Sequence, residues 1–219
     1  MNYPLGELVL YAFQNIGVRP TALLHEHMQS ARMAANMVLT NFSTRSGVNL
    51  WKIDLVTVLL IEGQTTYPVD ADTILMLDAY VTNNGIDRVI LPISRTEYSS
   101  YPNKEQQGST TVFWFDRQLA PTVTLWPVPD GQSQQTFSYY RMVQIDNATL
   151  ANGAKVDIPE VWMEAFSDAL AYRLARIWQP QAAGELKQIA EDSYTLASQQ
   201  NVEAAVTYIS PMIGGYYRN

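Results

Sequence analysis

The sequence predicts an α+β protein, in which helices from both chain ends form one bundle around an inserted β-rich part, followed by an extended C-terminal arm. Apolar residues recur at helical spacing in 22–45 and again after residue 159, whereas much of 51–142 alternates with a period of two. The tail is rich in tyrosine and follows neither period. We therefore expect four parts, namely an N-terminal part of the helical bundle, an inserted β-rich domain, a C-terminal part of the bundle and a docking arm: 1–49, 50–157, 158–206 and 207–219.

The N-terminal region contains a short helix and a long one. An amphipathic stretch over 5–16 ends at Gly17, and Thr21 is a suitable N-cap for a helix over 22–45. One face of the long helix carries apolar residues at steps of four and three: Leu24, Met28, Ala31, Ala35, Val38 and Phe42. Four neighbours widen this apolar side: Leu23, Ala34, Met37 and Asn41. This face is expected to pack against a partner helix.

The middle of the chain is expected to form short strands joined by turns. The run 51–61 is strand-like and is expected to form a hairpin with 65–68. A second hairpin is expected around Asn83-Asn84-Gly85, because these residues tolerate positive φ; its strands are 74–81 and 88–93. Further strands are expected at 111–116, 123–127 and 136–142, the last two joined across Asp130-Gly131.

A short helix and a loop interrupt the strands. Ser94 and Glu97 form a capping-box pattern that predicts a helix through about Tyr101, which Pro102 ends. The following residues, 103–110, are polar and include a glycine, so we expect a mobile loop there.

Two more helices are expected near the C-terminus. Pro159 suits the first helical position, and the helix that follows ends at Pro180. Its apolar side contains Trp162, Phe166, Ala169, Leu170, Leu174 and Ile177. A second helix is expected over about 182–202, with five inward residues: Leu186, Ile189, Ala190, Tyr194 and Ala197.

Composition excludes several classes of protein. With 219 residues and 47% apolar residues the chain can bury a substantial core, and the absence of cysteine excludes disulfides and thiolate metal sites. No stretch is long and apolar enough for a membrane span, and residues 1–17 lack the pattern of a signal peptide. The net charge is −7, distributed as +1 over 1–49, −5 over 50–158 and −3 over 159–219, without the clustered cations of a phosphate-binding surface.

Catalytic and metal-binding patterns are weak. His25 and His27 are two positions apart and point to different sides of a helix, so they are not expected to share a metal. Two acidic pairs are formally suited to acid and base catalysis, but Asp70 and Asp72 lie in a turn where short acids make local hydrogen bonds; the other pair is Glu191 and Asp192. The sequence contains no phosphate-binding glycine loop or nucleophile elbow. We expect no enzyme activity, no metal and no cofactor.

Aromatic residues of the β-rich part are the basis of an alternative hypothesis, a carbohydrate-binding tail module. The residues concerned are Trp51, Trp114, Trp126, Tyr139 and Tyr140. Aromatic residues in strands also serve in the core and in cross-strand pairs, so both interpretations stay open from the sequence.

An ordered set of motifs resembles the adaptor proteins of tailed bacteriophages, also called head-to-tail connectors or tail tubular proteins of short-tailed phages. The motifs extend over most of the chain: Tyr67-Pro68-Val69-Asp70, Leu91-Pro92-Ile93-Ser94-Arg95-Thr96-Glu97-Tyr98, Phe113-Trp114-Phe115-Asp116, Leu125-Trp126-Pro127-Val128-Pro129 and Ile158-Pro159-Glu160-Val161-Trp162. The resemblance implies a structural virion protein at the head-tail junction. It also implies a ring of twelve copies that joins the portal to the next tail component and continues the DNA channel during packaging completion and ejection.

The resemblance also suggests where the partners bind. The C-terminal arm is similar in character to one that reaches the portal, which makes five residues candidate portal contacts: Tyr208, Pro211, Tyr216, Tyr217 and Arg218. The polar loop is the candidate contact with the next tail component, a nozzle or tail tube, through Asn103, Lys104, Glu105 and Gln106. DNA is expected to pass through the lumen without sequence-specific binding, and no membrane partner is expected.

Overall fold

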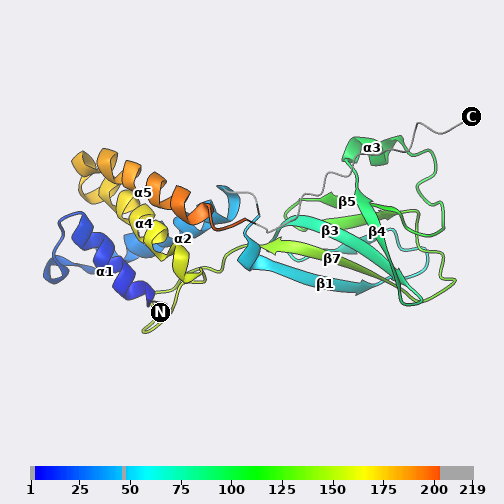
Figure 1. Ribbon diagram of the computed structural model, residues 1–219, viewed down its shortest axis with the longest axis horizontal. Coiled ribbons are helices and arrows are strands. Elements are labelled where there is room, and N and C mark those ends of the chain that lie inside the picture. Colours follow the sequence, from blue (N-terminus) through cyan, green and yellow to red (C-terminus); the bar gives the residue numbers. More distant parts are fainter. Residues whose placement is uncertain (1–2, 46–47, 203–219) are drawn as a thin grey trace, which may run out of the picture.

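A computed structural model describes residues 3–45 and 48–202, and the chain is α+β, as the sequence predicts (Figure 1). The described residues form five α-helices and a seven-stranded sheet. The helices are α1 (Leu5–Asn15), α2 (His25–Arg45), α3 (Arg95–Ser100), α4 (Met163–Trp178) and α5 (Ala183–Ser198). The strands are β1 (Ile53–Leu59), β2 (Thr66–Pro68), β3 (Thr73–Asn83), β4 (Ile86–Pro92), β5 (Val112–Asp116), β6 (Thr122–Trp126) and β7 (Gln135–Val143). In Figure 1 the sheet occupies one end of the molecule, with α3 beside it, and the other four helices occupy the opposite end.

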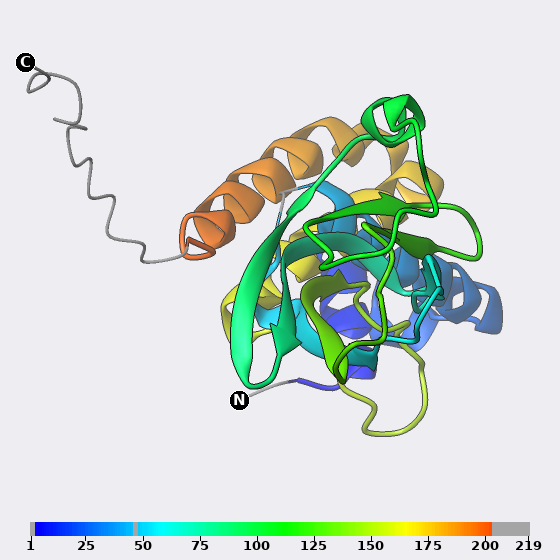
Figure 2. The same cartoon turned by 90° about the vertical axis from the view of Figure 1, so that its right-hand side faces the viewer.

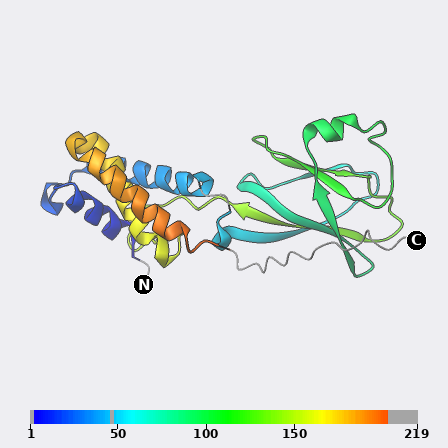
Figure 3. The same ribbon diagram turned by 45° about the horizontal axis from the view of Figure 1, so that its top comes forward.

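Helix α4 lies at the centre of the helical end. It contacts α1, α2 and α5, and α5 runs alongside it (Figure 3). The shared core includes large side chains from segments far apart in the sequence, among them Phe13, Phe42, Trp162 and Phe166. Arg45 at the end of α2 forms an ion pair with Glu191 of α5. The helices that precede the sheet in the sequence are thus joined to the helices that follow it by both apolar and ionic contacts.

Helix α2 begins three residues later than the sequence indicates. Thr21 is not its N-cap, because Pro20–Ala22 forms a separate 3₁₀ turn and Leu23 is extended. The helix begins at His25, and the backbone N–H of Leu24 donates to Nδ1 of His27 over 3.0 Å. His27, the third residue of the helix, therefore accepts from the backbone N–H of the residue that precedes the helix, a bond that glutamate or glutamine makes in a capping box.

Several side chains predicted to face inward are exposed. Leu24 is 59% exposed, Met37 50%, Ile177 57% and Ile189 43%. Leu24 lies before the helix begins, and the other three lie on helix faces that no part of the described chain covers. Most of the other predicted inward positions are buried, including Ala31, Ala35, Val38, Phe42, Phe166, Leu170, Leu174, Ala190, Tyr194 and Ala197.

The seven strands form one curled sheet in the order β1-β7-β3-β4-β5-β6-β2 (Figure 2). All neighbouring pairs are antiparallel except β4 and β5, which are parallel. The inner face of the sheet has its own core, separate from that of the helices, with Tyr67, Phe113, Leu125, Phe137 and Tyr139 among its members.

The hairpin around Asn83-Asn84-Gly85 is confirmed. Strands β3 and β4 pair from Asn83↔Ile86 to Ala79↔Ile90, and the two linking residues both have positive φ, +51° at Asn84 and +77° at Gly85. Two residues with positive φ match the twist of an antiparallel ribbon. The predicted cap and helix are also confirmed, since the backbone N–H of Glu97 donates to Oγ of Ser94 at the start of α3.

The other expected hairpin is wrong. Strand β1 pairs with β7, and β2 pairs with β6, so the two strands nearest in sequence do not pair with each other. Strands β6 and β7, on either side of Asp130-Gly131, are likewise consecutive but unpaired. Hydrophobic alternation identified these strands, whereas their partners are determined by the closure of the curled sheet.

Candidate interaction sites

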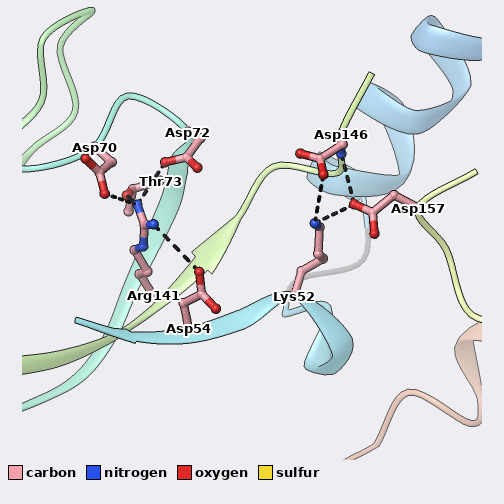
Figure 4. Close-up of polar contacts among 8 residues, drawn as sticks. All are labelled: Lys52, Asp54, Asp70, Asp72, Thr73, Arg141, Asp146 and Asp157. Atoms are coloured by element: carbon pink, nitrogen blue, oxygen red, sulfur yellow. Dashed lines mark hydrogen bonds and ion pairs between the residues drawn. The ribbon is translucent and has the colours of Figure 1, made fainter. Parts of the chain in front are cut away.

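The helical end and the sheet end of the molecule meet where the chain enters β1 and leaves β7. We call this region, residues 48–52 and 144–157, the neck. Lys52 forms ion pairs with Asp157 and, at 3.9 Å between Nζ and Oδ2, with Asp146 (Figure 4). The backbone N–H of Asp146 also donates to Asp157. One cation before β1 therefore binds two carboxylates that follow β7.

Buried polar side chains strengthen the neck. Asn49 is almost fully buried and donates from Nδ2 to the carbonyl of Phe42, while the backbone N–H of Ile145 donates to Oγ of Ser43. Buried polar groups are costly unless paired, so these bonds restrict how the helices and the sheet are oriented. The sequence pattern did not predict a role for these residues; the only signal was polar side chains at the boundaries of predicted elements.

The end of α5 is attached to the same neck. Asn201 donates from Nδ2 to the carbonyl of Val48 over 2.8 Å and accepts from the backbone N–H of Leu50 over 3.1 Å. Figure 3 shows the end of α5 near the start of β1. Five residues predicted to contact the portal lie outside the described residues: Tyr208, Pro211, Tyr216, Tyr217 and Arg218. The described chain shows only that the segment leading to them starts at the neck.

The polar loop predicted to contact a tail component is held by hydrogen bonds. The indole N–H of Trp126 donates to the carbonyl of Asn103, and Lys104 Nζ donates to the carbonyls of Ser99 and Tyr101. At the other end, the backbone N–H of Val128 donates to the carbonyl of Gln106. The loop expected to be mobile is therefore attached to α3 and to the end of β6. The structure brings the four named residues together on the exposed surface beside α3: Asn103, Lys104, Glu105 and Gln106.

The aromatic residues considered for sugar binding already have intramolecular partners. Trp114 stacks on Tyr98 with ring centroids 5.5 Å apart, and Trp126 stacks on Tyr101 at 4.2 Å. Both tyrosines belong to α3 or follow it directly, and burial raises the pKa of the Tyr98 hydroxyl above its ordinary value. Helix α3 thus covers the aromatic face that a sugar ring would need.

The other aromatic candidates do not join that face. Trp51 packs against Trp162 in the helical core with centroids 4.9 Å apart. Tyr139 is buried inside the sheet, where desolvation raises its pKa, whereas Tyr140 is 40% exposed. The five residues do not form one sugar-stacking platform.

The acidic turn serves a structural purpose. Asp70 and Asp72 both bind the guanidinium Nη1 of Arg141, at 3.0 and 2.8 Å, and Asp54 lies 3.7 Å from Nη2 (Figure 4). Thr73 accepts a further hydrogen bond from Nη1. Arg141 is buried in β7, so these carboxylates neutralise a buried cation, which is not the arrangement of a general acid and base.

The two histidines are separated, as expected from their spacing. His27 is buried and stacks on Trp178 with ring centroids 4.0 Å apart, while exposed His25 contacts Gln29. Within the described ranges, no group of three or more histidine and acidic side chains is arranged to hold a metal ion. In the same ranges, no helix combines the length and the apolar character needed to cross a bilayer.

These features describe an α+β protein whose polar residues orient its helical and sheet ends and which leaves a loop and several helix faces exposed. Comparison with known families agrees. The model of the family described as SU10 adaptor protein matches residues 14–211, and the chain belongs to this family. It is therefore a bacteriophage adaptor, a structural protein of the virion. No individually curated protein matches the sequence.

Proposed function

We propose that the chain forms an adaptor ring of twelve copies that joins the portal to the tail and continues the DNA channel during packaging completion and ejection. The observation that carries this proposal is the family match, which extends over residues 14–211 and so includes helices α2 to α5, the sheet and the start of the C-terminal segment. The non-enzymatic character of the family agrees with the structural use of Arg141 and its carboxylates.

The four parts expected from the sequence have separate tasks in this proposal. The helices of 1–49 and 158–206 act as one ring-forming bundle, and 50–157 acts as the tail-facing domain. The separate apolar cores of the helical end and the sheet support this division. Residues 207–219 act as an arm that docks on the portal through Tyr208, Pro211, Tyr216, Tyr217 and Arg218.

The attachment at Asn201 supports the proposed direction of the arm. Its two hydrogen bonds fix the end of α5 against Val48 and Leu50, so every copy presents the start of the arm at the same place. An arm that orders only on the portal lets free copies remain monomeric until the portal is present. Assembly then follows genome packaging.

The loop of Asn103, Lys104, Glu105 and Gln106 is the proposed contact with the next tail component. Its attachment to Trp126 and Val128 supports this role, because a contact loop that is held in place loses less conformational entropy on binding. A net charge of −7 on each copy suits a lumen through which DNA moves without being held.

Mass photometry of the chain with the portal ring encoded by the same phage tests this proposal. We expect the chain alone to be monomeric and to add one ring of copies to the portal. A chain lacking 207–219 should stay folded, by circular dichroism, and should not add to the portal. Ring formation by the truncated chain would exclude the arm, and failure of the full chain to bind the portal would exclude the adaptor role.

A matched variant separates the proposed tail contact from the proposed portal contact. Substituting Lys104, Glu105 and Gln106 with alanine leaves the carbonyl of Asn103 available to Trp126. We expect this variant to join the portal normally and to recruit the next tail component at least about tenfold more weakly. Unchanged recruitment would remove the loop from the interface.

A further inference from the structure

Two hollows that share three lining residues lie along the outer side of α2. The larger has a volume of about 930 Å³ and lies between α2, residues 147–149 and Arg173 of α4. The smaller, of about 320 Å³, extends it toward Arg176 and Ile177. We call these two hollows together the α2 groove.

The α2 groove combines cations with exposed apolar side chains. Met33 is 64% exposed and Met37 50%, and Ile177 at its edge is 57% exposed. Methionine is flexible and adapts to the shape of a partner. In a monomer these side chains would remain in contact with water, although the sequence pattern predicted that Met37 and Ile177 face inward.

The cations of the groove lack acidic partners in the described part of the chain. Arg32, Arg173 and Arg176 form none of the ion pairs found among the described residues. Arg173 donates instead to the backbone carbonyl of Met37. Burial, and next to it the charge of Arg176, lowers the pKa of Arg173. A patch of like charges that is partly desolvated is stabilised by an incoming carboxylate.

Helix α5 carries the complementary pattern on its outer face. Its exposed residues Glu185, Ile189, Asp192 and Leu196 are spaced by three or four positions, so they lie in one stripe. Ile189 is 43% and Leu196 65% exposed, and neither acid forms an ion pair within the described chain. The stripe therefore offers carboxylates and apolar side chains together.

The groove and the stripe are different surfaces of the helical end, although α2 and α5 also contact each other through Arg45 and Glu191 and through the rings of Phe42 and Tyr194. None of the stripe residues lines the groove of its own copy, and all four are exposed, so the stripe can be presented to a neighbour. Contact between two different patches is head-to-tail, the kind that closes into a ring when the rotation between copies allows it.

We propose that the α2 groove of one copy binds the outer stripe of α5 from the next copy, with Arg32 and Arg176 facing Glu185 and Asp192. This inference rests on the proposed ring and names the surfaces that build it. It also accounts for the apolar residues that remain exposed on both helices.

Charge reversal on the portal tests the contact. We expect the variant with Arg32→Glu and Arg176→Glu, and the variant with Glu185→Lys and Asp192→Lys, each to reduce the copies bound per portal by about tenfold or more. The four changes combined in one chain should restore the ring, because every interface then regains opposite charges. The matched control is Glu7→Lys with Glu164→Lys, which changes the net charge as the α5 variant does but leaves the stripe intact.

A second measurement does not depend on the charge variants. The natural sequence has no cysteine, so Met33→Cys with Ile189→Cys provides only two sites for a short bismaleimide cross-linker. We expect a ladder of multimers from portal-bound rings, and no ladder when Ile189→Cys is replaced by Tyr11→Cys, on an exposed residue of α1.

Each outcome decides the inference. Normal rings from both charge variants, or failure of the combined variant to restore them, would overturn the contact while leaving the adaptor role intact. Failure of the unaltered chain to assemble on the portal would overturn both. Binding of short duplex DNA to the free chain that Arg32→Glu with Arg176→Glu abolishes would assign the groove to nucleic acid and overturn the contact.

Discussion

Arg141 shows how one residue can change the interpretation of its neighbours. Along the sequence, Asp70 and Asp72 are two acids close together, which is compatible with acid and base chemistry. In the fold they bind a buried guanidinium from β7, about seventy positions away. The cation makes their structural role clear, and only the strand arrangement brings it there.

Replacing Arg141 should destabilise the sheet. We expect Arg141→Met to lower the free energy of unfolding by about 1–3 kcal/mol, because three carboxylates lose their shared partner while remaining partly hydrated. Urea unfolding measures this loss. The matched control is Asp54→Asn, which removes the longest contact and should cost less than about 1 kcal/mol. Equal losses in the two variants would contradict a central role for Arg141.

Asp168 of α4 makes stability depend on pH. Burial raises the pKa of its carboxyl, the charge of Glu164 raises it further, and a hydrogen bond from Ser193 opposes both. The folded chain therefore holds this proton more tightly than the unfolded chain. Tighter proton binding by Asp168 therefore stabilises the folded chain fully below the pKa of an unfolded aspartate, about 4. This stabilisation is lost as the pH rises through the pKa of Asp168 in the folded chain.

Asp168→Asn should remove the loss of stability that occurs as the pH rises. We expect the variant to gain melting temperature relative to the unaltered chain at pH 7, and to gain less or nothing at pH 4. Thermal melts at both pH values measure the difference. Asp192→Asn, at an exposed acid on α5, serves as the control for the substitution itself. An equal effect of Asp168→Asn at both pH values would show that burial of the charge is not the cause.

At the scale of elements, local signals identified the turns and caps well. Asn84 and Gly85 form the predicted reversal, and Ser94 caps α3 as predicted. These features depend on two to four consecutive residues, so the sequence contains all the information they need. Thr21 failed as a cap because a 3₁₀ turn at Pro20–Ala22 intervenes before α2.

Alanine substitution at two glycines, one in the turn between β3 and β4 and one in α5, tests the effect of positive φ in that turn. Gly85 has a φ of +77° and Gly184 of α5 has no positive φ, while an added Cβ meets nothing within 4 Å at either position. We expect Gly85→Ala to destabilise by about 1 kcal/mol, because alanine strains at positive φ, and Gly184→Ala to stabilise by about 0.5–1 kcal/mol. Chemical unfolding of both variants gives the comparison, and the same sign of change in both would refute the argument.

At the scale of the whole molecule, the neck gives the helical and sheet ends a defined orientation. Lys52 binds acids that follow β7, and Asn201 attaches the end of α5 beside the entry to β1. In the proposed ring this connection would place the tail-facing loop and the start of the arm in a constant relation in every copy. The ring itself would depend on two exposed surfaces of the helical end, the α2 groove and the outer stripe of α5.

The sequence by itself determined the α+β class, the positions of most helices and strands, the β3–β4 turn and the resemblance to phage adaptors. Periodicity and turn residues are local, so each element reports its own burial pattern. The tertiary structure alone decided that β1 pairs with β7, that α3 covers Trp114 and Trp126, and that Met37 and Ile189 face outward. These outcomes depend on contacts between residues far apart in the chain, and a pattern along one element does not specify which distant surface will cover it.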